Sequence, residues 1–262
     1  MNLRKILTLA VLLIFFMPVI CTGQTPEKMK AEVKGKEIFE KLITAIGGPG
    51  KINKLKNVFS TMEITRIVSP TRQPKFNAEV VVEYPDKYRY LSLLKEGNFI
   101  MAINGNQGWM RIPPENTLTP MTDQDVKAAI SNILRDPIYI YRNLDRYTIK
   151  LMEEKDFDGK RIIDLLFTGP AEFHLYIDAG TYLPSAFTYR EAMIGMADQT
   201  ATVREEIFSD YKEVDGMKMS FKIVIKSNGK KILEVSIKEY QLNIKLKKDF
   251  FKIKGGSPNE KK

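Results

Sequence analysis

The sequence predicts a mainly β protein of the α+β class: a curved antiparallel half-barrel of about eleven strands, with two or three helices plugging or covering its concave face. Three observations support this. Short segments of alternating apolar and polar residues recur along most of the chain, turn signals separate them, and no βαβ alternation is present. With 262 residues, of which 44% are hydrophobic, the chain can bury the core of one such domain.

Residues Val203–Ile225 show the alternation most clearly. Asp215-Gly216 tolerates the positive φ angles of a tight turn, so this segment is interpreted as two strands joined there. The second strand alternates apolar with mostly cationic side chains: Met217, Met219, Phe221, Ile223 and Ile225 against Lys218, Ser220, Lys222 and Val224. Because successive side chains of a strand point to opposite faces, the hairpin predicts a sheet with an apolar face that another element must cover.

The other strands are predicted from similar patterns. They are Asn57–Val68, Lys75–Tyr84, Lys87–Lys95, Asn98–Ile103, Gly108–Ile112, Tyr147–Glu153, Arg161–Phe167, Phe173–Ile177, Leu183–Arg190 and Lys230–Ile244. In the last of these the apolar parity changes near Glu239, which predicts a β-bulge. A loop is expected at Ala192–Gln199.

Helices are predicted at two places. Gly35–Ile46 has apolar residues at three- and four-residue spacing, and the glycines and proline of residues 47–50 end it. Thr122-Asp123 could cap a second helix over Gln124–Leu134. The tyrosine-rich Ile138–Leu144 could be a helix or an irregular lid. The insertion Asp123–Leu144 is therefore where we expect a cover over the sheet.

The N-terminus is predicted to lie outside the folded domain. Residues 1–23 resemble an export signal, with two basic residues followed by a short apolar run, and we expect cleavage between Gly23 and Gln24. There are two alternatives: lipidation at Cys21, which would make the protein a lipoprotein, and retention of the uncleaved N-terminal segment as an anchor. We expect an exported, periplasmic protein with a flexible lead-in at 24–34, a single folded domain at 35–254 and a disordered tail at 255–262.

The charge excludes little by itself. The formal net charge is +9, but the basic residues are scattered along strands, without a dense run or a recognisable nucleic-acid motif. We therefore expect no nucleic-acid partner, whereas an affinity for anionic membrane surfaces stays open.

The sequence offers little catalytic chemistry. His174 is the only histidine, and it alternates with the apolar Phe173 and Leu175, so it is interpreted as a surface residue. No zinc spacing, nucleophile elbow, phosphate loop or dinucleotide fingerprint is present. We expect no enzyme activity, no metal and no cofactor, with a carboxylate-dependent hydrolase as a distant alternative.

Six segments, taken in their order, resemble the periplasmic lipoprotein-carrier superfamily, the LolA/LolB-like outer-membrane lipoprotein-sorting proteins. They are IFEKLITAIGGPGKINKLKNV (Ile38–Val58), YPDKYRY (Tyr84–Tyr90), NGNQGWM (Asn104–Met110), LYIDAGTYLP (Leu175–Pro184), FSDYKEVDGMKMSFKI (Phe208–Ile223) and DFFKIK (Asp249–Lys254). The resemblance implies a half-open barrel, plugged by helices, whose hollow binds acyl chains. The functional arginine of the carriers could correspond to Arg66, Arg89 or Arg111, and we assign it to none of them.

The apolar side chains of the predicted strands are then candidate cavity residues. Methionine is flexible and suits surfaces that accommodate variable ligands. The candidates are Met101, Ile103, Trp109, Met217, Met219 and Phe221. We expect a monomer that binds lipid or lipoprotein acyl chains for carriage toward the outer membrane, with an envelope membrane protein as a further candidate partner. The alternative is a protein-interaction or stress-sensing module of the cell envelope on the same fold.

Overall fold

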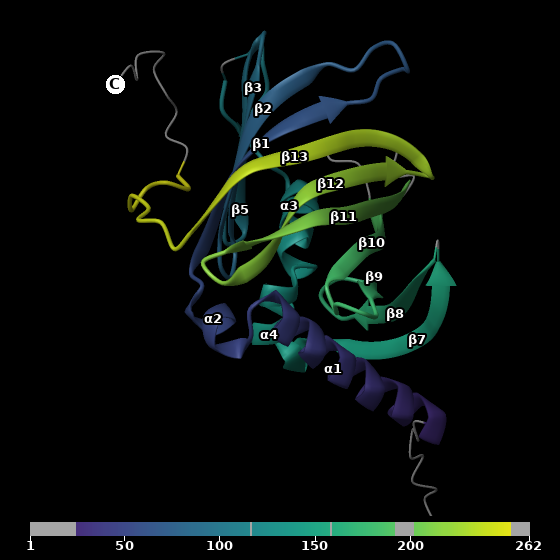
Figure 1. Cartoon of the computed structure of the whole chain (residues 1–262). Coiled ribbons are helices and arrows are strands. Elements are labelled where there is room, and N and C mark those ends of the chain that lie inside the picture. The colour runs from purple at the N-terminus through teal and green to yellow at the C-terminus, as the bar shows by residue number, and fades with distance from the viewer. Residues whose placement is uncertain (1–24, 116, 158, 192–201, 253–262) are drawn as a thin grey trace, which may run out of the picture.

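The computed structural model describes residues 25–115, 117–157, 159–191 and 202–252. Within them, thirteen strands form one antiparallel sheet that curves without closing (Figure 1). The strands are β1 (Asn57–Arg66), β2 (Lys75–Glu83), β3 (Lys87–Leu94), β4 (Gly97–Asn104), β5 (Gln107–Arg111), β6 (Thr119–Pro120), β7 (Thr148–Phe157), β8 (Lys160–Thr168), β9 (Phe173–Asp178), β10 (Pro184–Glu191), β11 (Thr202–Val214), β12 (Met217–Ser227) and β13 (Lys230–Leu242). The predicted half-barrel is confirmed.

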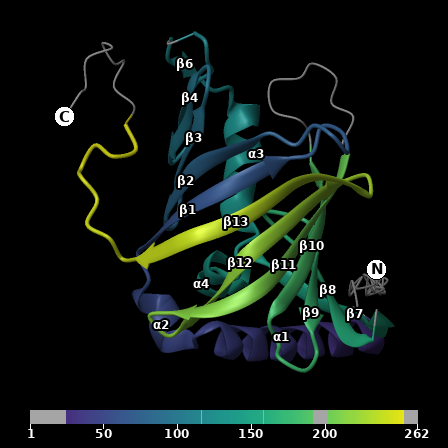
Figure 2. The same ribbon diagram turned by 45° about the horizontal axis from the view of Figure 1, so that its top comes forward.

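The order of the strands explains why the sheet stays open. It runs β6-β5-β4-β3-β2-β1-β13-β12-β11-β10-β9-β8-β7, so the first and last strands pair in the middle and β6 and β7 are the two edges. These edges follow one another in the chain and are joined by the helical segment between them. That segment lies within the curve of the sheet (Figure 2), as expected for the insertion.

Four α-helices and one 3-10 turn accompany the sheet in the described residues. They are α1 (Pro26–Ile46), α2 (Pro49–Lys54), α3 (Asp123–Leu134), α4 (Pro137–Arg142) and η1 (Leu144–Arg146). Thr122 caps α3 in a reciprocal capping box with Asp125, which confirms the predicted cap. For the tyrosine-rich segment Ile138–Leu144 the sequence allows a helix or an irregular lid, and the structure shows that most of it is helical.

The structure extends the predicted helix toward the N-terminus: α1 begins at Pro26 rather than near Gly35, and so includes most of the residues expected to form a lead-in. Residues 26–34 lack an apolar stripe, with Met29 and Val33 exposed, so periodicity gives no sign of a helix there. Pro26 at the first turn, Glu27 beside the helix N-terminus and a run of good helix formers supply the local stability instead.

The part of the core that holds α1 lies between this helix and the concave face of β8 to β10. Phe167 of β8 stacks on Phe173 of β9 with ring centroids 4.8 Å apart. Phe173 meets Phe187 of β10 edge to face at 5.5 Å, and the ring of Phe39 on α1 lies 5.4 Å from that of Phe167. This aromatic row holds α1 against the sheet.

Two predicted details are confirmed, one in the hairpin of β11 and β12 and one in the neighbouring strand β13. Asp215 and Gly216 both have positive φ, at 49° and 75°, and Val214 pairs with Met217 across a two-residue turn. The predicted bulge lies where Thr61 pairs with Glu239 but Met62 with Ile237, so the parity change keeps both apolar runs of β13 on one face. Ser220, expected on the polar face of β12, is buried and donates through its hydroxyl to the carbonyl oxygen of Ser209 at 2.8 Å.

Several predicted features lie outside the described residues. They are the signal segment 1–23 with Cys21 and the Gly23–Gln24 cleavage site, the loop Ala192–Gln199 and the tail 255–262.

Candidate ligand-binding site

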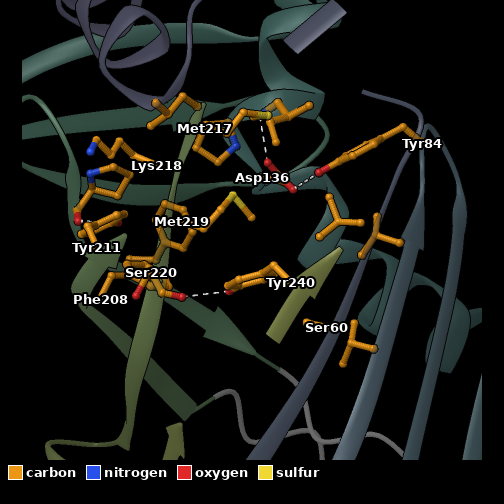
Figure 3. A pocket seen from close by; sticks show the side chains of 18 residues that line it. Ser60, Tyr84, Asp136, Phe208, Tyr211, Met217, Lys218, Met219, Ser220 and Tyr240 are labelled. Carbon is orange, nitrogen blue, oxygen red and sulfur yellow. Dashed lines mark hydrogen bonds between the residues drawn. The ribbon is translucent and has the colours of Figure 1, made fainter. Parts of the chain in front are cut away.

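A cavity of about 250 Å³ lies inside the curve of the sheet, at the end where β1 and β12 begin and β2 and β13 end. Its walls come from the C-terminus of α1, from α4, and from the concave sides of β1, β2, β10, β11, β12 and β13 (Figure 3). The lining residues are Ile46, Val58, Ser60, Val80, Val82, Tyr84, Asp136, Pro137, Ile138, Pro184, Phe187, Phe208, Tyr211, Met217, Lys218, Met219, Ser220 and Tyr240. Most of them are apolar.

The hydroxyl groups of the pocket tyrosines are already bonded to the protein. The hydroxyl of Tyr240 donates to the carbonyl oxygen of Ser220 at 2.9 Å, and that of Tyr211 donates to the carbonyl oxygen of Pro184 at 2.8 Å. Burial raises the pKa of both phenols, which stay neutral at physiological pH. The rings of these tyrosines therefore add apolar surface to the cavity, because their polar atoms are satisfied elsewhere.

Asp136 is the one carboxyl group among the lining residues. Its Oδ1 accepts a hydrogen bond from the backbone N–H of Ile138 at 2.8 Å, which makes it the cap of α4, and its Oδ2 accepts one from the hydroxyl of Tyr84 (Figure 3). Burial raises the pKa of Asp136, although both hydrogen bonds and the charge of Arg142 act in the opposite direction. Burial also raises the pKa of Tyr84, and the negative charge of Asp136 raises it further.

Buried apolar side chains and a small set of hydrogen bonds hold α4 over the pocket, and Ile138, Tyr139 and Ile140 belong to the core. Besides the Tyr84–Asp136 hydrogen bond, the guanidinium group of Arg142 donates to the carbonyl oxygens of Ile52 and Leu55. The same guanidinium lies 5.2 Å from the ring centroid of Tyr84. Because α4 has only six residues, these tertiary contacts rather than its own backbone hydrogen bonds keep it in place.

The structure brings two of the six predicted site residues to the pocket, Met217 and Met219. Ile103 is fully buried in the core beneath α3, and Met101 packs against the same cluster. Phe221 does not line the pocket and packs in a second apolar cluster, with its ring 5.3 Å from that of Tyr240.

Trp109 is on the opposite side of the sheet. A Cβ on its neighbour Gly108 would touch Met121 and Val126, so Gly108 faces α3. Trp109 must then point outward from β5, on the face that also carries its strand partner Ala102. Arg89 pairs with the same alanine and lies 4.6 Å from the ring of Phe250, so the segment after β13 packs on this outer face.

The most informative lining residues escaped sequence reasoning. Val80 and Val82 share a parity in β2 and were on the apolar side of a predicted strand, so their position could be found. Tyr84 continues the same parity, but its contact with Asp136 could not be predicted, because it joins positions 52 residues apart across the insertion.

His174 is less isolated than the sequence indicates. Its Nδ1 lies 2.9 Å from Oδ1 of Asp164, whose side chain is buried. The histidine itself is partly exposed on the outer face of the sheet, away from the pocket. Among the described residues, no group of three or more histidine, cysteine, aspartate or glutamate side chains is arranged to hold a metal ion. None of the described helices is both long and apolar enough to cross a membrane.

No family model matches the sequence. A search of curated proteins likewise gives no match.

The similarity to known proteins is structural. A putative outer membrane lipoprotein-sorting protein domain from Vibrio parahaemolyticus superposes with a TM-score of 0.58 at 12% identity, covering 84% of this chain and 97% of that one. A LolA superfamily protein from Nitrosomonas europaea gives a TM-score of 0.58 at 12% identity over 83% and 96% of the two chains. A DUF1329 family protein from Desulfovibrio piger gives 0.56 at 11% identity, again over 83% and 96%. The chain therefore has the LolA-like fold that the sequence segments suggested.

Proposed function

We propose that this protein is exported to the cell envelope and binds the acyl chains of a lipid or lipoprotein, as a carrier and not as an enzyme. The observation that carries the proposal is the pocket itself, which is walled mainly by apolar side chains and by tyrosine rings whose hydroxyls are bonded elsewhere. Such a lining rewards the burial of hydrocarbon and offers few polar groups to a soluble metabolite.

The size of the pocket constrains how cargo can enter. Burial of each methylene group is worth about 0.8 kcal/mol, so a long acyl chain gains on the order of 10 kcal/mol when it leaves water. Sites for drug-sized ligands enclose about 300–1,000 Å³. The cavity of about 250 Å³ is smaller. A wall must therefore move before a full acyl chain fits.

The wall best suited to move is α4. Pro137 and Ile138 line the pocket from this six-residue helix, whose hydrogen bonds to the rest of the fold involve Tyr84, Asp136 and Arg142 and whose apolar side chains pack in the core. In the proposed exchange, the side chains of α4 leave the apolar face of the sheet and an acyl chain replaces them. An envelope membrane protein that hands over or receives the cargo is the further partner that this role requires.

The test is equilibrium binding of a fluorescent fatty acid and a fluorescent lipopeptide to delipidated protein. Met219→Lys places an ammonium group in the apolar pocket, where its burial is unfavourable. We expect the dissociation constant of both probes to rise at least about tenfold, which corresponds to about 1.4 kcal/mol.

Met152→Lys is the matched control, because Met152 is 51% exposed on β7. This variant should bind like the unmodified protein, and circular dichroism should show both variants folded. The proposal is wrong if the delipidated protein takes up neither probe. Equal binding by the two variants would place the site elsewhere.

A further inference from the structure

The end of the sheet that contains the pocket carries a group of exposed lysines. They belong to α2 and the residues after it, and to the segment that follows β13: Lys51, Lys54, Lys56, Lys245, Lys247 and Lys248. We call these six residues the cationic end. None of them forms an ion pair within the part of the chain that the structure describes.

Hydrogen bonds join the two segments into one surface. The backbone N–H of Lys56 donates to the side-chain oxygen of Asn243 at 2.6 Å, and the side-chain amide of Asn57 donates to the carbonyl oxygen of Ile244 at 3.1 Å. In Figure 1, α2 and the start of the segment after β13 lie at the same end of the molecule.

The cationic end adjoins the pocket. The ammonium group of Lys51 donates to the carbonyl oxygen of Asp215 at 3.3 Å, on the turn that leads directly into Met217 and Lys218. A Cβ on Gly216 would lie 1.5 Å from this ammonium group, so Lys51 occupies the space above the glycine. Met217 and Lys218 both line the pocket. A surface that binds the cationic end therefore faces the strand that opens the cavity.

Nearby carboxylates do not neutralise this surface. Glu213 pairs with Lys218 at 3.6 Å and Asp249 with Lys252 at 3.6 Å, so each is already matched by another lysine. Asp86 and Asp215, in the turns at the same end, form no ion pair with any of the six lysines in the described residues. The ammonium groups of the cationic end are therefore not matched by carboxylate partners.

We propose that the cationic end docks on the surface of an anionic phospholipid bilayer and presents the pocket to it. All six residues are lysines, whose compact and strongly hydrated charges attract a layer of phosphate groups without requiring a fixed geometry. Residues 49–56 and 243–248 contain no arginine and no aromatic residue, the side chains with which proteins stack on bases and grip nucleic acid. Docking through these charges does not depend on what the pocket binds.

The test is co-sedimentation of the chain from Gln24 onward with vesicles of phosphatidylcholine alone and with vesicles that also contain phosphatidylglycerol. Each lysine near an anionic surface contributes about fivefold to partitioning. A variant with Lys54→Gln, Lys247→Gln and Lys248→Gln should therefore bind the mixed vesicles on the order of 100-fold more weakly. Added salt should weaken binding of the unmodified protein because it screens the charges.

The matched control replaces three exposed lysines elsewhere, Lys95, Lys160 and Lys230, with glutamine. It changes the net charge equally and should leave binding nearly unchanged. Equal losses in the two variants would overturn the proposal, as would a failure of the protein to prefer the anionic vesicles. Binding of a short RNA duplex as strong as that of the mixed vesicles would also overturn it. Loss of vesicle binding with intact uptake of the fluorescent probes would leave the proposed function standing.

Discussion

Asp136 shows how one side chain links the pocket to its movable wall. It caps α4 and also accepts a hydrogen bond from the hydroxyl of Tyr84, which directly follows β2, so the helix and the sheet meet at one carboxyl group. The groups facing it are Tyr84, Tyr240 and Arg142, and burial outweighs them by raising its pKa. The carboxyl therefore carries a free-energy cost when it ionises in the folded protein.

This cost predicts a pH dependence of stability. At a pH between the ordinary aspartate value of 3.8 and the raised value, folded Asp136 keeps a proton that the unfolded chain has lost. Because the folded state binds more protons there, this residue lowers the free energy of unfolding as pH rises through that window. Asp136→Asn keeps a capping side chain but removes the titration. We therefore expect the unfolding free energy of Asp136→Asn minus that of the unmodified protein to increase as the pH is raised through this window. Urea titrations at several pH values measure it.

Asp145→Asn serves as the control, since Asp145 is exposed on η1. Its profile should run parallel to that of the unmodified protein at every pH. A parallel profile for Asp136→Asn as well would show that burial of this carboxyl has no energetic consequence.

The face on which a site residue lies could be predicted only where the apolar–polar alternation of a single strand determines it. The alternation of β12 predicts Met217 and Met219 on an apolar face, because the other face of this long strand carries lysines, and both residues line the pocket. Trp109 lies in the five-residue strand β5, in which neighbouring Met110 is equally apolar. Local pattern does not distinguish the faces there, and the partner strand and α3 decide the outcome.

At the scale of elements, α1 depends on a glycine that permits close packing. A Cβ on Gly35 would lie 2.7 Å from the carbonyl oxygen of Ile149, on the edge strand β7. Backbone atoms cannot yield as a flexible side chain can, so Gly35→Ala must displace the helix or the strand. We expect a loss of about 1–3 kcal/mol in the free energy of unfolding, measured with urea.

Gly50→Ala on α2 is the control with the opposite sign. No atom lies within 4 Å of a Cβ at this position. Alanine favours the helical backbone over glycine, so this variant should gain up to about 1 kcal/mol. If Gly35→Ala also raised the free energy of unfolding, α1 would not lie in close contact with the backbone of β7.

Most elements could be predicted from periodicity and turn residues, and the exceptions have physical causes. The first part of α1 lacks an apolar stripe, and its position beside β7, with Glu32 4.0 Å from Lys150, is a tertiary property. The bulge in β13 was predictable because a change of parity forces it if both apolar runs are to stay buried.

At the scale of the molecule, the sequence could suggest an antiparallel half-barrel but not the order of its strands. The pairing of β1 with β13 joins the two ends of the domain and follows from no local signal. It has a consequence for dynamics, because these strands are hydrogen-bonded on both sides in the middle of the sheet. The helical segment instead connects the two edges, β6 and β7, and is the part that can move without breaking the sheet.

This difference predicts separate opening of α4, measurable by native-state hydrogen exchange. The N–H of Ile140, bonded to the carbonyl oxygen of Asp136 at 3.0 Å, should exchange at least about tenfold faster than the N–H groups of central β1. A saturating acyl ligand should speed exchange in α4 further, because the ligand displaces the helix, while exchange in β1 and β13 stays unchanged or slows. If α4 exchanges only through global unfolding, with and without ligand, the pocket is rigid. A full acyl chain could then not enter a cavity of about 250 Å³.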